Sequence, residues 1–139
     1  MTSPRVCNRN ALEAPMTTGD RRISLHLEHA LIDVAVESWR FSRLFARAVS
    51  KLDADESARY GGQLRFFLRK LEQSLGATGL SLVNVEGHPY VPGMAASALN
   101  LSDFTPDASL VVDQMVEPIV MGLDGLRRQG TVVLRSIKK

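Results

Sequence analysis

Residues 20–52 read DRRISLHLEHALIDVAVESWRFSRLFARAVSKL, and this stretch decides the fold. Its apolar residues recur at alternating steps of four and three once Ser38 fills one place, which is the spacing of a heptad seam along a helix. The seam consists of Leu27, Leu31, Val34, Phe41, Phe45, Ala48 and Leu52. A second apolar row widens the face beyond a two-stranded seam: Ile32, Ala35, Trp39, Ala46 and Val49. The stretch therefore predicts a long helix that packs against more than one neighbour.

The length of this helix indicates how it is used. A helix over residues 20–52 would extend on the order of 50 Å, whereas a compact globule of this mass has a diameter of about 37 Å. The helix therefore cannot be buried within its own domain, and we expect it to be one arm of a dimer. The predicted dimerisation residues are Leu27, Leu31, Val34, Phe41 and Phe45. Residues 1–19 show no apolar period and are predicted to be a disordered tail, and the polar run of residues 17–20 can cap the helix.

A second helix is predicted to begin at a capping box. Asp53 offers an N-cap acceptor and Glu56 follows three residues later. The apolar row of this helix is Tyr60, Leu64, Phe67, Leu71 and Leu75. Gly61 and Gly62 lie inside it and indicate either a weak point, with a kink or a later helix start, or the close approach of another backbone. Gly76 and Gly79 supply the predicted stop.

The pattern changes to that of strands after Gly79. Residues 80–87 alternate as a strand, residues 88–93 form a loop, and residues 94–101 are expected to add one or two helical turns. Residues 109–121 and 126–137 are predicted to form a hairpin around the Asp124-Gly125 turn, bent or at an edge at Pro118 and bulged at Gly130. The fold class is therefore α+β, with a helical dimerisation region at residues 20–78 and a small β-domain at residues 79–139.

Composition places the chain among soluble, folded proteins. Of its 139 residues, 45% are hydrophobic and 23% are charged, and the net charge is only +2. No apolar stretch reaches the roughly 18 residues of a membrane span, so no membrane association is expected. Cys7 is the only cysteine, which excludes an intramolecular disulfide and favours a reducing compartment. The sequence thus predicts a cytoplasmic protein.

Groups with catalytic potential do not form a recognisable constellation. The motifs of zinc proteases, serine hydrolases and nucleotide-binding loops are absent. His29 and Asp33 have the spacing of a two-point metal grip, with His26 nearby, but zinc needs a third and usually a fourth ligand. Asp53, Asp55 and Glu56 could do acid–base work, although capping a helix explains them better. The sequence predicts no enzyme, no metal and no cofactor.

The two predicted helices carry a surplus of cations. These are Arg40, Arg43, Arg47, Lys51, Arg59, Arg65, Arg69 and Lys70. A basic helical face can bind phosphates. The aromatic residues of this region fall on the apolar rows and not among the basic ones, so platforms for base stacking are not indicated. A solvated face or a protein partner is favoured over nucleic acid.

The order of these parts resembles that of the GrpE nucleotide exchange factors. Residues 79–83 (GLSLV) and 87–92 (GHPYVP) are similar to the family's strand and following proline loop. Residues 116–121 (VEPIVM), the Asp124-Gly125 turn and residues 126–134 (LRRQGTVVL) are similar to its final hairpin. The chain departs from the family's pattern at Val91, before the loop proline, and at Gln129, where the last strand of the family carries proline. The resemblance covers residues 23–137 and indicates a divergent member.

The resemblance implies a mechanical function. Members are homodimers joined by their long helices, and the β-domain presses on the ATPase domain of a DnaK-type chaperone so that ADP leaves. The matching partner-binding positions are Met115, Glu117, Pro118, Met121 and Arg127 on the hairpin, with Arg59 and Arg65 on the helical side. Two alternatives stay open: a structural or adaptor protein that dimerises without affecting nucleotide exchange, and a nucleic-acid binder that uses the basic helices.

Overall fold

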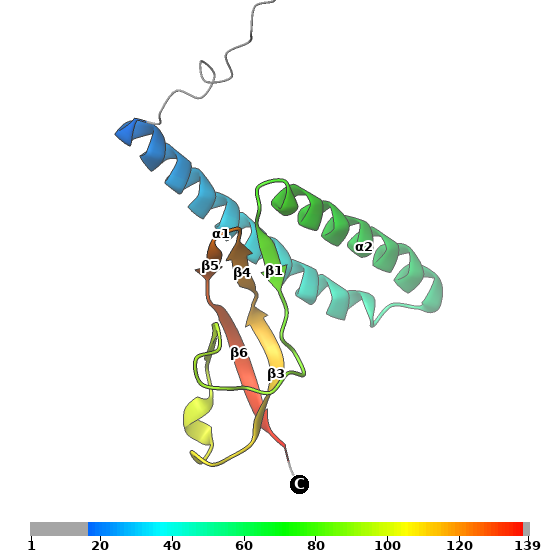
Figure 1. The fold of residues 1–139 in the computed structure, drawn as a ribbon. Coiled ribbons are helices and arrows are strands. Elements are labelled where there is room, and N and C mark those ends of the chain that lie inside the picture. Colours follow the sequence, from blue (N-terminus) through cyan, green and yellow to red (C-terminus); the bar gives the residue numbers. More distant parts are fainter. Residues whose placement is uncertain (1–16, 138–139) are drawn as a thin grey trace, which may run out of the picture. The chain divides into compact units, whose positions relative to one another are not determined.

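The computed structural model describes residues 17–137. Among these residues, two helices, α1 (Thr18–Val49) and α2 (Ala54–Gly76), precede six short strands and a 3₁₀ turn (Figure 1). The chain divides into two units, residues 1–31 and residues 32–139. The described strands all belong to the second unit. The architecture is α+β with a β-rich C-terminal region, as the sequence predicts.

The described part of the first unit is the start of α1, and a reciprocal cap explains where it begins. The Asp20 amide donates to Thr17 Oγ1 at 3.1 Å, and the Thr17 amide donates to Asp20 Oδ2 at 3.4 Å. These bonds satisfy donors that a helix start leaves unpaired. The predicted cap is thus confirmed, but the helix already contains Thr18 and Gly19, which were expected to belong to the tail. The rest of that predicted tail, residues 1–16, lies outside the described residues.

In the second unit, α1 buries one side and exposes another. Ile32, Ala35, Val36, Trp39 and Val49 are buried. These include four members of the second apolar row, so the widened face does pack as expected. The helix ends at Val49 instead of Leu52, because the amides of residues 51 and 52 donate to carbonyls three residues back and tighten the last turn.

A side-chain cap also begins α2. Asp53 has extended backbone angles and its Oδ1 accepts from the Glu56 amide at 2.9 Å. The predicted helix start is confirmed. The cap also sets the direction of the chain after the short connection of residues 50–53, so that α2 returns alongside α1 in the second unit (Figure 1).

Removing this cap is expected to destabilise the protein by about 1 kcal/mol. In Asp53→Ala the Glu56 amide loses its acceptor, whereas Asp55→Ala, in the same turn, loses only a favourable interaction with the helix dipole. Urea unfolding followed by circular dichroism measures both variants. Equal losses of unfolding free energy in the two variants would show that the cap contributes nothing of its own.

The glycine pair does not interrupt α2, which runs unbroken through Gly61 and Gly62. A Cβ atom added at Gly61 would lie 3.6 Å from a guanidinium nitrogen of Arg65 and 4.0 Å from Val49 Cγ1. Both distances are ordinary van der Waals contacts, and neither involves backbone. The glycines therefore do not interrupt the helix, and no other backbone approaches them closely.

The six strands form two three-stranded sheets. One contains β1 (Ser81–Val83), β4 (Ile119–Gly122) and β5 (Gly125–Arg128) in the antiparallel order β1-β4-β5. The other has the order β2-β6-β3, with β2 (Ala96–Ala98) parallel and β3 (Leu110–Glu117) antiparallel to β6 (Gly130–Ser136). The predicted hairpin is therefore present, but its two arms are shared between two sheets.

Pro118 and Gly130 lie where the arms pass from one sheet to the other. Pro118 is the break between β3 and β4, as its missing amide predicts. The bulge expected at Gly130 is not there. The register shifts lie at residues 112–114, 115–117 and 120–121 instead. Gly130 is needed for space, because a Cβ atom there would lie 3.0 Å from the Glu117 carbonyl oxygen and 2.9 Å from two side chains.

The prediction of one or two helical turns at residues 94–101 is wrong. Residues 96–98 form β2, and a 3₁₀ turn follows at Leu101–Asp103. Long-range bonds to β6 hold this segment: the Gly130 amide donates to the Ala95 carbonyl, and the Leu99 amide donates to the Val132 carbonyl. The Asn100 side chain both donates to and accepts from the Leu134 backbone, at 2.9 and 2.8 Å. Partners more than 30 residues away thus override the local propensity.

One core joins α1 to the strands. Trp39 packs with seven buried residues of the β-rich region: Ala96, Leu110, Val112, Met115, Ile119, Val132 and Leu134. Two ion pairs flank this anchor, Arg43 with Glu86 and Arg128 with Asp33, the latter at 2.7 Å. The second half of α1 is therefore fixed to the strands by apolar packing and by charge. Within residues 17–137, neither helix is both long enough and apolar enough to cross a membrane.

Candidate functional site

The predicted dimerisation residues lie largely on the exposed side of α1. In the first unit Leu27 is 65% exposed and Leu31 is half-buried. In the second unit Val34 is 61% and Phe41 is 63% exposed, and Phe45 is half-buried. The two apolar rows therefore have different roles. Four of the five residues of the second row are buried in the second unit, whereas Ala46 is exposed, and the heptad seam is left largely exposed.

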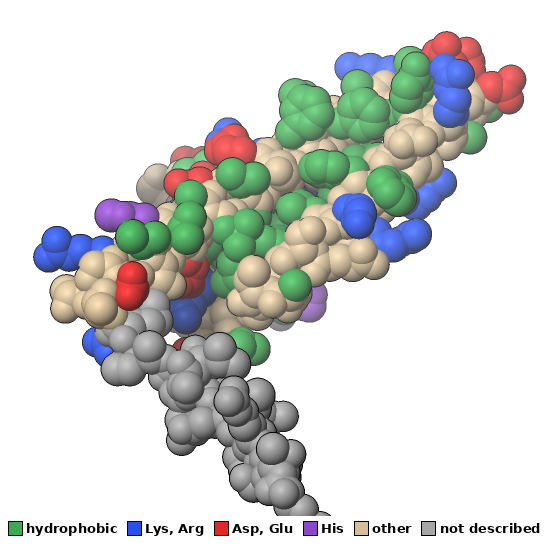
Figure 2. Space-filling view, turned by 90° about the horizontal axis from the view of Figure 1, so that it is seen from above, with side chains coloured by type: hydrophobic (Ala, Val, Ile, Leu, Met, Phe, Trp, Pro, Cys, Tyr) green, Lys and Arg blue, Asp and Glu red, His purple; other side chains and the backbone are tan. Residues whose placement is uncertain are grey.

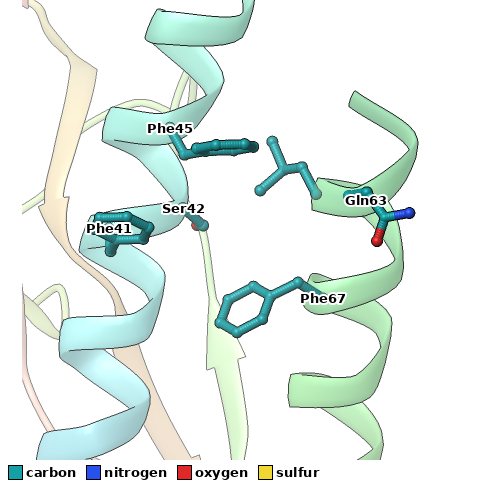
Figure 3. Close-up of a pocket in the computed structure, with 6 residues that line it drawn as sticks. Phe41, Ser42, Phe45, Gln63 and Phe67 are labelled. Atoms are coloured by element: carbon teal, nitrogen blue, oxygen red, sulfur yellow. The ribbon is translucent and has the colours of Figure 1, made fainter. Parts of the chain in front are cut away.

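A hollow between α1 and α2 continues this exposed surface. Phe41, Ser42 and Phe45 of α1 line it opposite Gln63, Leu64 and Phe67 of α2 (Figure 3). Its volume of 210 Å³ is below the roughly 300 Å³ at which small-molecule pockets begin. The hollow is thus suited to side chains rather than to a metabolite.

Aromatic contacts shape the hollow. The Phe41 and Phe45 rings stack with centroids 6.4 Å apart, and the Phe45 ring meets Tyr60 edge-on at 6.5 Å. Phe67, across the hollow, is 42% exposed. Apolar side chains also gather between the two helices in the space-filling view (Figure 2). We refer to Val34, Phe41, Phe45, Leu64 and Phe67 as the helical apolar face. An apolar surface of this kind is typical of an interaction site.

The structure divides the predicted partner-binding residues of the hairpin into two groups. Met115 is 2% exposed and Pro118 is fully buried, so we correct their assignment: both are core residues without a surface to offer a partner. Glu117 and Met121 are half-buried, and Arg127 is exposed. Arg127 lies 3.7 Å from Asp124 across the turn. Sequence alone does not separate the two groups, because alternation is disturbed by the register shifts of β3 and β4.

Two exposed leucines flank the hairpin turn and were not predicted. Leu123 is 88% exposed and Leu126 is 45% exposed. Their apolar character gave no signal for exposure, because an Asp-Gly hairpin turn is commonly flanked by alternating apolar residues. Together with Met121 and Arg127 they form the hairpin tip, a small surface that combines apolar contact with one cation.

The two predicted helical contact residues, Arg59 and Arg65, belong to the exposed surface of α2. The Arg59 guanidinium donates to the Tyr60 hydroxyl at 3.2 Å and lies 4.9 Å from the centre of its ring. The Arg65 guanidinium lies beside Gly61 and Gly62. Neither arginine is part of the hairpin tip. A partner that contacted every position implied by the resemblance would therefore have to bind two separate regions of this chain.

The described residues provide no arrangement for metal binding. Within residues 17–137, no three His, Cys, Asp or Glu side chains come together as a metal site. Asp53 is occupied as a helix cap, and Cys7 lies outside the described residues.

Comparison with known proteins found no matching family model, no matching curated protein and no matching solved structure.

Proposed function

We propose that this chain is a GrpE-like nucleotide exchange factor: a homodimer that binds the ATPase domain of a DnaK-type chaperone and promotes ADP release. One observation carries the proposal. A two-helix arm with an exposed apolar face is fixed to a small β-rich region that ends in an exposed hairpin tip. This order of parts is the one that the sequence resemblance implies.

The helical apolar face supports the dimer in this proposal. Its exposed aromatic rings and the hollow between them can be covered by a second copy of the chain, because that copy supplies the same apolar side chains. Burying one ring stabilises an assembly by about 1.5–3 kcal/mol. A two-fold interface uses each residue twice, so the five residues of the helical apolar face supply ten side chains.

The anchor between α1 and the strands supports a mechanical role. Trp39 and the pairs Arg43–Glu86 and Asp33–Arg128 connect the helix to the β-rich region at three places. A contact made at the hairpin tip is therefore held by a stiff support. The proposed factor binds the open form of the nucleotide cleft better than the closed form, and it shifts that equilibrium only by the difference in affinity. A DnaK-type partner and the single Cys7 fit a cytoplasmic location.

The test is the release of a fluorescent ADP analogue from a DnaK-type ATPase domain of the same organism, followed by stopped flow. We expect the protein to accelerate release. The double variant Leu123→Ser/Arg127→Ser, which removes the hairpin tip, should reduce the acceleration at least tenfold, as expected for loss of about 1.4 kcal/mol or more of binding to the open cleft.

A matched control is Leu99→Ser/Arg135→Ser. Leu99 is 65% exposed, and Arg135 is an exposed arginine paired with an aspartate, as Arg127 is. This control should release ADP like the parent. Equal losses in both double variants would remove the hairpin tip from the mechanism. A parent protein that dimerises but accelerates release from no DnaK-type chaperone of that organism would replace this function with that of an adaptor.

A further inference from the structure

A groove in the second unit lies between the end of α1 and strand β3. Its α1 side carries Arg40, Arg43, Leu44 and Arg47, and its β3 side carries Gln114 and Val116. We refer to these six residues as the arginine groove. An adjoining hollow on α1 extends it toward Ser50 and again includes Arg43 and Arg47. The groove is separate from the helical apolar face and from the hairpin tip, which contain none of its residues.

The groove has an excess of positive charge. Arg40 pairs with Glu37 at 3.1 Å, but both side chains are about half exposed or more, so this pair is weak. Arg43 pairs with Glu86 and lies 5.2 Å from the centre of the Trp39 ring. Arg47 has no carboxylate partner among residues 17–137, and the β3 side contributes no acid. Three guanidinium groups on successive turns thus have two carboxylate partners, Glu37 and Glu86, and the Glu86 carboxylate also accepts from the Met115 amide at 3.0 Å.

An apolar strip runs through the same groove. Leu44 stands between the arginines and is 62% exposed, and Val116 is half-buried on the opposite wall. Beneath them the core residues Trp39 and Met115 close the floor. A ligand that fills this groove must therefore present carboxylates to arginines and an aliphatic group to Leu44 and Val116.

We propose that the arginine groove binds an acidic segment of a partner protein that inserts an aliphatic side chain between its carboxylates. Arginine suits this ligand because its planar guanidinium donates two parallel hydrogen bonds to one carboxylate. Nucleic acid fits less well. Stacking of bases needs an accessible aromatic face, and the single aromatic residue at this groove, Trp39, is 9% exposed and is covered by Arg43. The inference does not rest on the proposed exchange activity.

The test measures fluorescence anisotropy of a labelled twelve-residue peptide of Asp and Glu with leucine at every fourth position, added to the full chain at low and high salt. Arg40→Gln/Arg47→Gln should weaken binding at least fivefold at low salt. The control Arg69→Gln/Lys70→Gln removes two exposed cations from α2 and should change it less than twofold. Leu44→Asn should weaken binding at high salt as well, where charges are screened, while Leu99→Asn should not.

Three outcomes would overturn the proposal. The first is equal binding of a peptide in which Asn and Gln replace the acidic residues. The second is an equal effect of the two double variants. The third is tighter binding of a single-stranded oligonucleotide than of the peptide, which would assign the arginines to phosphates. Thermal melts test whether all variants are folded. We expect that they are, because each substitution lies on an exposed side chain or on one at the edge of the groove.

Discussion

Phe41→Asp/Phe67→Asp is expected to convert the proposed dimer to a monomer. Both rings belong to the helical apolar face, and the free chain exposes 63% of Phe41 and 42% of Phe67. Removing four rings from a two-fold interface costs about 6–12 kcal/mol at about 1.5–3 kcal/mol per ring. The dissociation constant should therefore rise by more than about a thousandfold. Sedimentation velocity at micromolar concentration separates the two states.

The control for this experiment places aspartate at exposed apolar positions outside that face. Leu99 is 65% exposed and Leu123 is 88% exposed, so Leu99→Asp/Leu123→Asp makes the same change in charge and should stay a dimer. Both variants should remain folded, because none of the four side chains is buried. A parent protein that sediments as a monomer at micromolar concentration would contradict the dimer and, with it, the proposed mode of action.

Trp39→Ala is expected to cost about 3–5 kcal/mol of unfolding free energy. Trp39 is the residue of α1 that enters the core of the β-rich region, and its ring also supports the Arg43 guanidinium. Its loss leaves a cavity beside Met115, Leu110 and Val132 and weakens the attachment of the helix to the strands. The effect is measured by urea unfolding. Unfolding is followed by circular dichroism and by a spectroscopic probe of the sheets that does not use tryptophan fluorescence.

Leu44→Ala is the control on the same helix. Leu44 is 62% exposed, alanine is a strong helix former, and surface changes of this kind stay within about 0.5 kcal/mol. If Trp39→Ala cost no more than this control, the contact between α1 and the strands would not be the anchor that the proposed mechanism needs. ADP release measured with folded Trp39→Ala should then also match the parent, which provides a second check.

These two substitutions address different parts of the proposal. The phenylalanines concern assembly, and Trp39 concerns the transmission of a contact from the hairpin tip to the arm. On the proposed function, a variant that loses the dimer but keeps a stable fold is expected to contact a chaperone through one hairpin tip only. A variant that loses the anchor would keep both surfaces but connect them less firmly. Measuring assembly, stability and ADP release on each variant separates the effects.

The two helices were predictable because their signals are local. The Asp53–Glu56 cap and the apolar periodicity lie within a few residues of the structure they specify, and the helices were predicted within three residues at the ends that the structure describes. The sequence did not indicate which of the two apolar rows of α1 is buried and which is exposed. Both rows are apolar, and their different roles follow from Trp39 meeting residues about 60–95 positions away in the chain.

In the β-rich region, more of the structure depends on features that local sequence signals do not indicate. The hairpin and the break at Pro118 follow from turn chemistry and a missing amide. The register shifts do not, and they decide that Met115 and Pro118 point into the core while Arg127 is exposed. Four of the five predicted hairpin contacts were therefore core or half-buried residues, and the exposed leucines of the hairpin tip became visible only in the structure.

The sequence alone determined the α+β class, the two capped helices, the hairpin and the expectation of an outward-facing seam. It could do so because periodicity, caps and turns act over short distances along the chain. The tertiary structure decided the rest. It made residues 96–98 a strand through bonds to β6, left Phe41 and Phe67 exposed, and brought three arginines of α1 opposite residues 114–116 of β3. Those features depend on groups that are distant in sequence, and only the folded chain brings such groups within bonding distance.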